Sequence, residues 1–233
     1  MIRRSLNFVI RGLILQNRIV KLLKKDFYIE FRSRASINIS LAFAGITTLS
    51  VSLTSATMNL PFRVHSILIW VIIFFSAMNS LSHIFIREEE EGTSIFLSIH
   101  SEAEEIYIAK LLFNFILFIV ITVVVTPLYL FFMQIWPENF IFFASSVFCG
   151  STALSSITTT LGAIVAKTSM RSSLFTVISF PLTIPVLWIS INLTASSLEG
   201  GSVDLLNLLF LLAFSGVIVS FSYLLFKFIW MEQ

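Results

Sequence analysis

The sequence predicts an all-α membrane protein with six transmembrane helices, an N-terminal amphipathic helix in the membrane interface, and both termini in the cytoplasm. Of its 233 residues, 57% are hydrophobic and only 12% are charged, and the mean hydropathy is +0.94. Soluble domains carry about 25% charged residues. A soluble protein of this size could not bury so much apolar surface, so the chain is expected to lie in a lipid bilayer.

The apolar residues are gathered in stretches of membrane-spanning length. A helix needs about 20 mostly apolar residues to cross a hydrocarbon core about 30 Å thick. Six stretches satisfy this: 37–58, 65–86, 108–135, 140–166, 173–195 and 205–230. We therefore predict a basic arm with an interfacial helix over 1–34 and one six-span membrane domain over 35–233.

Prolines interrupt two of these stretches. Pro127 is expected to bend the third span, and Pro181 and Pro185 to kink the fifth. Carbonyls freed by a proline need partners within a membrane, so we expect the stretch around Pro181 and Pro185 to face protein or a cavity.

The basic residues predict the orientation. Lys and Arg accumulate in cytoplasmic loops. Every Lys and Arg except Arg63 falls in the N-terminal segment, in the loops after the second and fourth spans, or at the C-terminal end. The termini and these two loops are therefore expected on the cytoplasmic side.

The segment 17–34 predicts a helix parallel to the membrane surface. Apolar residues recur every four positions, at Ile19, Leu23, Phe27 and Phe31, with lysines and arginines around them. A basic amphipathic helix of this kind lies in the interface, where its lysines meet anionic lipid. A generic juxtamembrane anchor and an elbow helix leading into the first span of a transporter both fit this pattern.

The loop 87–107 predicts a docking element. It begins with Arg87, four glutamates and Gly92, continues with an apolar patch that includes Phe96 and Leu97, and ends in further acidic residues. A short amphipathic helix here could insert its apolar residues into a cleft of a soluble partner, with carboxylates around the rim. The predicted partner-binding residues are Arg87, Glu88, Glu91, Gly92, Phe96 and Leu97. The alternative is a solvated loop.

Other motifs argue against several classes of protein. The lone Cys149 allows neither an intrachain disulfide nor a Cys-x-x-Cys site. His65, His83 and His100 have no second histidine at ligand spacing, so each is expected to be structural, although haem ligation, best placed at His65, stays an alternative. No P-loop or hydrolase motif occurs, so no catalytic residue, metal site or enzyme activity is predicted. No Asp or Glu lies inside the spans, which argues against an ion-coupled carrier.

The small and hydroxyl residues of 140–166 let helices approach closely. Packing inside the bundle, a subunit interface and a cavity lining are all open interpretations of this pattern.

Three stretches give the chain a resemblance to a known family. KDFYIEFRSR (25–34), FIREEEEGTS (85–94) with IYIAKLLFNF (106–115), and FPLTIPVL (180–187) are similar to the B subunit of the cytochrome c maturation system. That family, also called haem exporter protein B, resembles the permeases of type-2 ABC exporters. The stretch 98–105 departs from it, since the family usually carries prolines there.

The resemblance implies a permease that is not itself an enzyme and that works in a bacterial inner membrane. It implies an ATP-binding subunit, a haem-handling C subunit and a small D subunit as partners, alongside membrane lipid and without nucleic acid. No cofactor is expected on this chain, and haem is a candidate substrate of the complex. Another type-2 exporter permease, for a lipid, drug or polysaccharide, and a non-transporting membrane scaffold are the alternatives.

Overall fold

The chain folds as a set of helices. The computed structural model describes residues 2–33, 35–55, 58–81, 88, 91–166 and 171–231, and no strand occurs in these ranges. The helices are α1 (Ile2–Ser33), α2 (Ala35–Ser55), α3 (Phe62–Leu81), α5 (Thr93–His100), α6 (Ala103–Met133), α7 (Phe140–Val165), α8 (Arg171–Leu198) and α9 (Leu205–Met231). Each of the six predicted spans overlaps one of the long helices, and residues 56–57 and 82–86 of the first two predicted spans lie outside the described residues.

Five of these helices are long and apolar enough to cross a membrane. They cover Ile37–Ser55, Ala103–Met133, Phe140–Val165, Val177–Leu198 and Leu205–Phe228. The helix α3 contributes a shorter apolar stretch, Phe62–Ser76. The helical, multi-span architecture is therefore confirmed, while a sixth crossing by α3 and the cytoplasmic side of the termini stay predictions.

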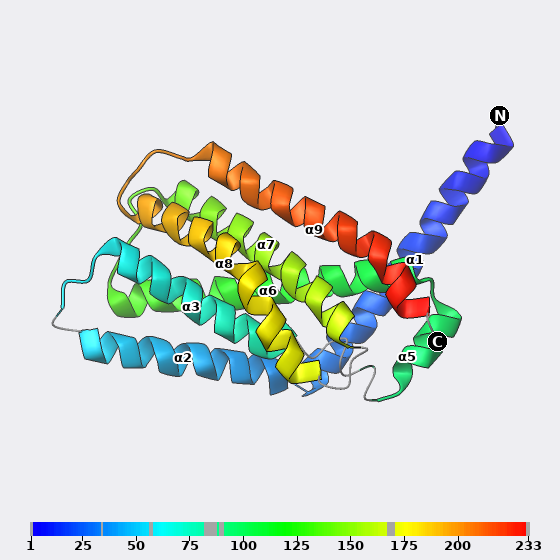
Figure 1. Cartoon of the computed structure of the whole chain (residues 1–233), viewed down its shortest axis with the longest axis horizontal. Coiled ribbons are helices and arrows are strands. Elements are labelled where there is room, and N and C mark those ends of the chain that lie inside the picture. Colours follow the sequence, from blue (N-terminus) through cyan, green and yellow to red (C-terminus); the bar gives the residue numbers. More distant parts are fainter. Residues whose placement is uncertain are drawn as a thin grey trace.

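The long helices lie side by side, and the bundle has two distinct ends (Figure 1). The short helix α5, the C-terminal end of α9 and the junction of α1 with the bundle lie at one end, which we call the α5 end. The connections from α6 to α7 and from α8 to α9 lie at the opposite end, which we call the far end. The helix α1 crosses the α5 end obliquely and extends beyond it.

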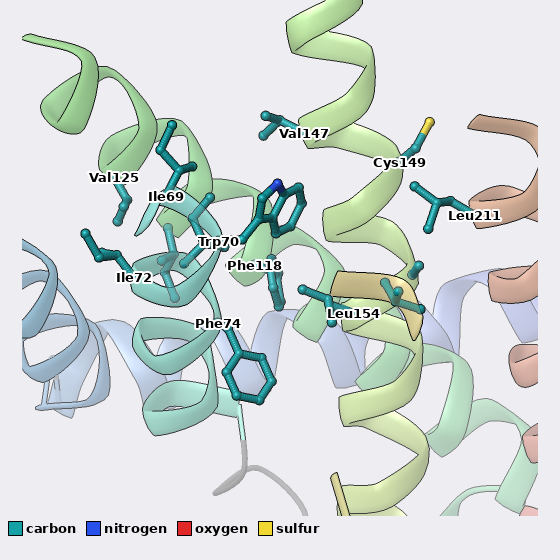
Figure 2. Packing of buried hydrophobic residues seen from close by; sticks show 14 of the residues in the cluster. Ile69, Trp70, Ile72, Phe74, Phe118, Val125, Val147, Cys149, Leu154 and Leu211 are labelled. Atoms are coloured by element: carbon teal, nitrogen blue, oxygen red, sulfur yellow. The ribbon is translucent and has the colours of Figure 1, made fainter. Parts of the chain in front are cut away.

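The helix α7 occupies the centre of the bundle, where it contacts α6, α8 and α9. At Gly150 an added Cβ would collide with the Trp70 ring and the Ser190 hydroxyl. The Trp70 indole is fully buried among apolar side chains (Figure 2) and donates from Nε1 to Thr194 Oγ1 at 2.9 Å. Among the interpretations of the small residues in 140–166, packing inside the bundle therefore holds for the middle of the helix.

Polar side chains also join the helices inside the core. Asn114 Nδ2 of α6 donates to Thr159 Oγ1 of α7 at 3.0 Å. The hydroxyls of Ser156 in α7 and Ser215 in α9 lie 2.6 Å apart. Hydrogen bonds of this kind add to helix association in a lipid environment, where water cannot compete for the groups.

The two prolines of α8 lie on its exposed side. Pro181 and Pro185 share that side with Ile184, which is 59% exposed, whereas Thr183 is buried and donates to the Ser179 carbonyl at 2.9 Å. The protein or cavity contact expected at the prolines is therefore not made by the described residues of this chain. The kink itself stays a prediction.

Candidate functional site

The predicted docking loop contains a short helix, as expected, and a glycine sets its start. The turn at 91–92 precedes α5, and Gly92 has a φ of 68°. An added Cβ at Gly92 would meet nothing within 4 Å, so the left-handed backbone, and not crowding, favours glycine here. Thr93 Oγ1 donates to the Glu88 carbonyl at 3.2 Å and ties the turn together.

The two residues predicted as docking anchors point in different directions. Leu97 is only 6% exposed and packs in a cluster made by α5, α6, α7 and α9, with Ala103, Ile106, Tyr107, Ala163, Ala166 and Phe226. Phe96 is 62% exposed and Ile99 is 73% exposed. Leu97 therefore holds α5 against the bundle, while Phe96 and Ile99 form its outward apolar surface.

Behind α5 lies a cluster of four charged residues, which we call the buried ion network: Lys25 and Asp26 of α1, Glu88, and Lys110 of α6. Lys110 Nζ lies 2.6 Å from Glu88 Oε1 and 3.1 Å from Asp26 Oδ1. Lys25 Nζ lies 2.5 Å from the same Glu88 oxygen and 3.4 Å from Asp26 Oδ1. The network joins α1, the segment before α5, and the start of α6.

The described members of the ion network balance in charge, with two ammonium groups facing two carboxylates. The side chains of Lys110, Asp26 and Glu88 are 3%, 4% and 8% exposed. Charges removed from water in this way are tolerated only when each is paired. Burial lowers the pKa of Lys25, but the carboxylates of Asp26 and Glu88 outweigh burial and raise this pKa above its usual value, so Lys25 stays charged at neutral pH.

A second ion pair repeats the connection between α1 and α6. Arg18 lies 3.7 Å from the Glu105 carboxylate, which also accepts a hydrogen bond from the Glu102 backbone N–H at 3.2 Å. The Glu102 and Glu105 pair is a typical helix-capping arrangement. The first turn of α6 is thus fixed to its own cap and to α1 at once.

The glutamates predicted to surround the docking surface of 87–107 do not all lie at the surface. Glu91 is exposed, as a rim residue would be, whereas Glu88 is buried in the ion network. Arg87 lies outside the described residues. The sequence reasoning missed Asp26 and Lys110 as site residues. Two signals were present: Lys110 is a lone charge at the head of an apolar span, and Asp26 is an acid within a strongly basic segment.

The apolar residues of α1 that were predicted to face the membrane pack in part against the bundle. Leu23 and Phe27 pack against the core, and the Phe27 ring centroid lies 4.8 Å from that of Phe113 in α6. Ile19 is half-buried and Phe31 is 60% exposed. Steps of four residues advance about 40° around a helix, so the stripe turns from the bundle toward the outside. Its contact with the membrane stays a prediction.

At the far end, a cavity of about 570 Å³ opens between α2, α3 and α6. His65 lies at its wall, and its Nδ1 is 3.0 Å from the hydroxyl of the buried Tyr129. Within the described ranges, no group of three or more His, Cys, Asp and Glu residues could hold a metal. His83 lies outside the described residues. Nδ1 of His65 is thus engaged within the chain, and the structural role of His65 stays a prediction.

The sequence comparison agrees with the earlier resemblance. Residues 17–226 match the model of the family described as CcmB protein. The matched range begins inside α1 and ends inside α9. No curated relative matches the chain. The match covers the ion network, α5 and the other helices in full, apart from the first part of α1 and the last residues of α9. The chain belongs to the CcmB family, the B subunit of the haem exporter of cytochrome c maturation.

Proposed function

We propose that this chain converts ATP hydrolysis by a separate subunit into haem export, or into loading and release of a haem chaperone, at the periplasmic face. As a CcmB protein it is a permease component of the ABC system for cytochrome c maturation. Its sequence carries no nucleotide-binding motif, so the ATP chemistry is assigned to a partner. Energy must then enter this chain through a protein contact.

The α5 end is proposed to face the cytoplasm of a bacterium, with the bundle in the inner membrane. The distribution of Lys and Arg supports this orientation, because all but Arg63 lie toward the α5 end in the predicted topology. An ATP-binding subunit in the cytoplasm would then meet α5 directly. Family membership supports the C and D subunits as further partners within the membrane.

The contact that receives the partner is proposed to be the outward surface of α5. Phe96 and Ile99 are three residues apart, so they lie on the same face of the helix. Apolar and aromatic anchors contribute most of the free energy of an interface, and charges at the rim, such as Glu91, tune encounter and specificity.

The single observation that carries the proposal is that the contacts of α5, and of Glu88 just before it, reach α1, α6, α7 and α9. Leu97 fixes α5 against α6, α7 and α9, and Glu88, just before α5, bonds to Lys110 of α6 and Lys25 of α1. Thr93 Oγ1 at the start of α5 also bonds to the Glu88 carbonyl, so a push on α5 is expected to reach Glu88. It is passed to the start of α6 and to α1 together.

The test is co-purification of the ATP-binding subunit with permease variants at matched expression. The double substitution Phe96→Ala with Ile99→Ala should release the partner, because losing one buried anchor costs about 2 kcal/mol or more, which is more than tenfold in affinity at about 1.4 kcal/mol per decade. A matched control is Phe140→Ala with Ile141→Ala, an exposed Phe and Ile pair outside the α5 end. The control should keep the partner.

Leu97→Ala serves as a second comparison. It removes a buried side chain, so it should lower the stability of the permease itself by about 2–5 kcal/mol and not act on the interface alone. If the Phe96 and Ile99 variant retains the ATP-binding subunit at wild-type levels, α5 is not the docking element. The same assay would then be applied to α1.

A further inference from the structure

Arg63 is the one basic residue, counting Lys and Arg, that lies toward the far end in the predicted topology. It is the second residue of α3, and its side chain is exposed. Its guanidinium lies against α8, where Nη2 donates to Asn192 Oδ1 at 3.2 Å and Cζ lies 5.7 Å from the centroid of the Trp188 ring. The positive charge is therefore held at a defined place between two helices.

The two partners of Arg63 on α8 also bond to each other. Asn192 Nδ2 donates to the Trp188 carbonyl at 2.9 Å, so the amide that receives Arg63 is itself fixed. The guanidinium carries more N–H groups than one amide oxygen can accept. The Trp188 ring is 63% exposed. A ligand that approaches from outside the bundle would thus meet an oriented cation beside an open indole ring.

The charge of Arg63 is not balanced by a carboxylate in the ranges that the structure describes. Two acidic residues of the far end are placed elsewhere. Asp204 accepts a hydrogen bond from the Asn207 backbone N–H at 3.1 Å at the start of α9, and the Glu138 carboxylate lies against Gly200. The site therefore offers an anion a positive charge.

The partners of Arg63 also indicate its depth. Asn192 and Trp188 belong to the predicted fifth span, 173–195, and lie about 9 Å and about 15 Å along α8 before Leu198. The guanidinium is therefore expected to lie beside hydrocarbon and not in the loop beyond it. A charged side chain at such a position is costly unless an opposite charge accompanies it, which favours an anionic ligand.

An apolar strip runs from Arg63 away from the far end. On α3, Ile67 and Val71 follow at steps of four residues, so they share its side of the helix, and each is 40% exposed. On α8, which lies against α3 (Figure 1), Ile184 precedes Trp188 by four residues and is 59% exposed. A surface with one positive charge at its end and apolar side chains along its length fits an acidic amphiphile.

We propose that Arg63, with Asn192 and Trp188, binds a carboxylate of haem at the far end, while the macrocycle lies on the apolar strip. Haem carries its carboxylates on one edge of a flat, mostly apolar ring. A guanidinium can bind a carboxylate through two parallel hydrogen bonds. The inference rests on the proposed haem-handling function, and it adds a direct contact between haem and this chain. The phosphate of a phospholipid presents a similar oxyanion, so the experiment separates the two.

The test is a titration of ferric haem, followed by visible absorbance, into the full chain in phosphatidylcholine nanodiscs. Empty nanodiscs give the background from partition into lipid. A parallel titration uses haem dimethyl ester, in which both carboxylates are blocked. The wild type should bind haem about tenfold more tightly than the ester, the effect of one hydrogen bond to a charged group. Arg63→Gln should lose that preference and bind the ester as the wild type does.

Two further variants make the result specific. Arg32→Gln is the same chemical change at an exposed arginine of α1, and it should leave the preference for haem over the ester intact. Arg63→Lys keeps the charge but not the planar pair of donors, so it should retain only part of the preference. It takes the place of Arg63→Gln if that variant does not fold.

Equal binding of haem and its ester by the wild type would overturn the proposal, and so would a full preference in Arg63→Gln. Nanodiscs with phosphatidylglycerol test the other ligand. If the difference between wild type and Arg63→Gln disappears there, lipid phosphate occupies the site and haem is not its ligand. The α5 experiment reads a different property, so release of the ATP-binding subunit by the α5 variant would stand even if Arg63 fails this test.

Discussion

Replacing Lys110 by methionine tests the buried ion network most directly. Methionine keeps much of the length and apolar character of the lysine side chain but removes its charge. Among the described residues, two buried carboxylates, Asp26 and Glu88, would then share the single ammonium group of Lys25, whose side chain is 35% exposed. The site changes from electrically balanced to one unpaired negative charge.

The magnitude follows from the burial of the partners. Breaking a buried ion pair by removing one member typically costs about 3–5 kcal/mol, because the remaining charge is left uncompensated. Lys25 still faces both carboxylates, so we expect a loss near the lower end, about 3 kcal/mol. Adding Glu88→Gln removes the excess negative charge and should recover at least half of that loss.

The assay is reversible unfolding in mixed detergent micelles, with ATP-driven haem handling of the complex measured in parallel. Lys227→Met, an exposed lysine in α9, is the control and should change stability by less than about 0.5 kcal/mol. The reasoning is refuted if Lys110→Met is no worse than that control. It is also refuted if the losses from Lys110→Met and Glu88→Gln simply add, because coupled charges must show an interaction term.

Three further outcomes are expected. Reporter fusions after Gln134 should read as periplasmic and those after Gly92 as cytoplasmic, and the reverse pattern at either site would overturn the proposed orientation. Gly150→Ala should destabilise the bundle by about 1–3 kcal/mol in the same unfolding assay, because the new methyl group collides with core side chains. His65→Asn should leave the haem content of the purified complex intact, since no second histidine lies at ligand spacing from His65 in the sequence, whereas loss of haem would make His65 a ligand.

Hydropathy and charge along the chain were enough to predict the helices. Each of the six predicted spans overlaps a long helix in the described residues, because the free energy of placing a residue in lipid is a local property that adds along the chain. The short helix between the second and third spans was also predictable from Gly92 and the apolar patch that follows.

The contacts of the candidate site were not predictable in this way. Lys110 and Asp26 are 84 positions apart, and nothing in either neighbourhood indicates that they meet. Glu88 to Glu91 look equivalent in sequence, yet Glu88 is buried and Glu91 is exposed. Which carboxylate turns inward depends on where the two ammonium groups lie, and that is a property of packing between helices.

For the same reason, the sequence does not show which of Phe96 and Leu97 is buried, or which side of α1 faces the bundle. The sequence by itself determined that α5 and α1 are amphipathic helices at one end of a membrane bundle. Only the tertiary structure decided which of their apolar residues are buried against the protein and which stay outside. The physical reason is that the hydrophobic effect is non-directional, so a side chain's burial is settled by the neighbours that the fold brings to it.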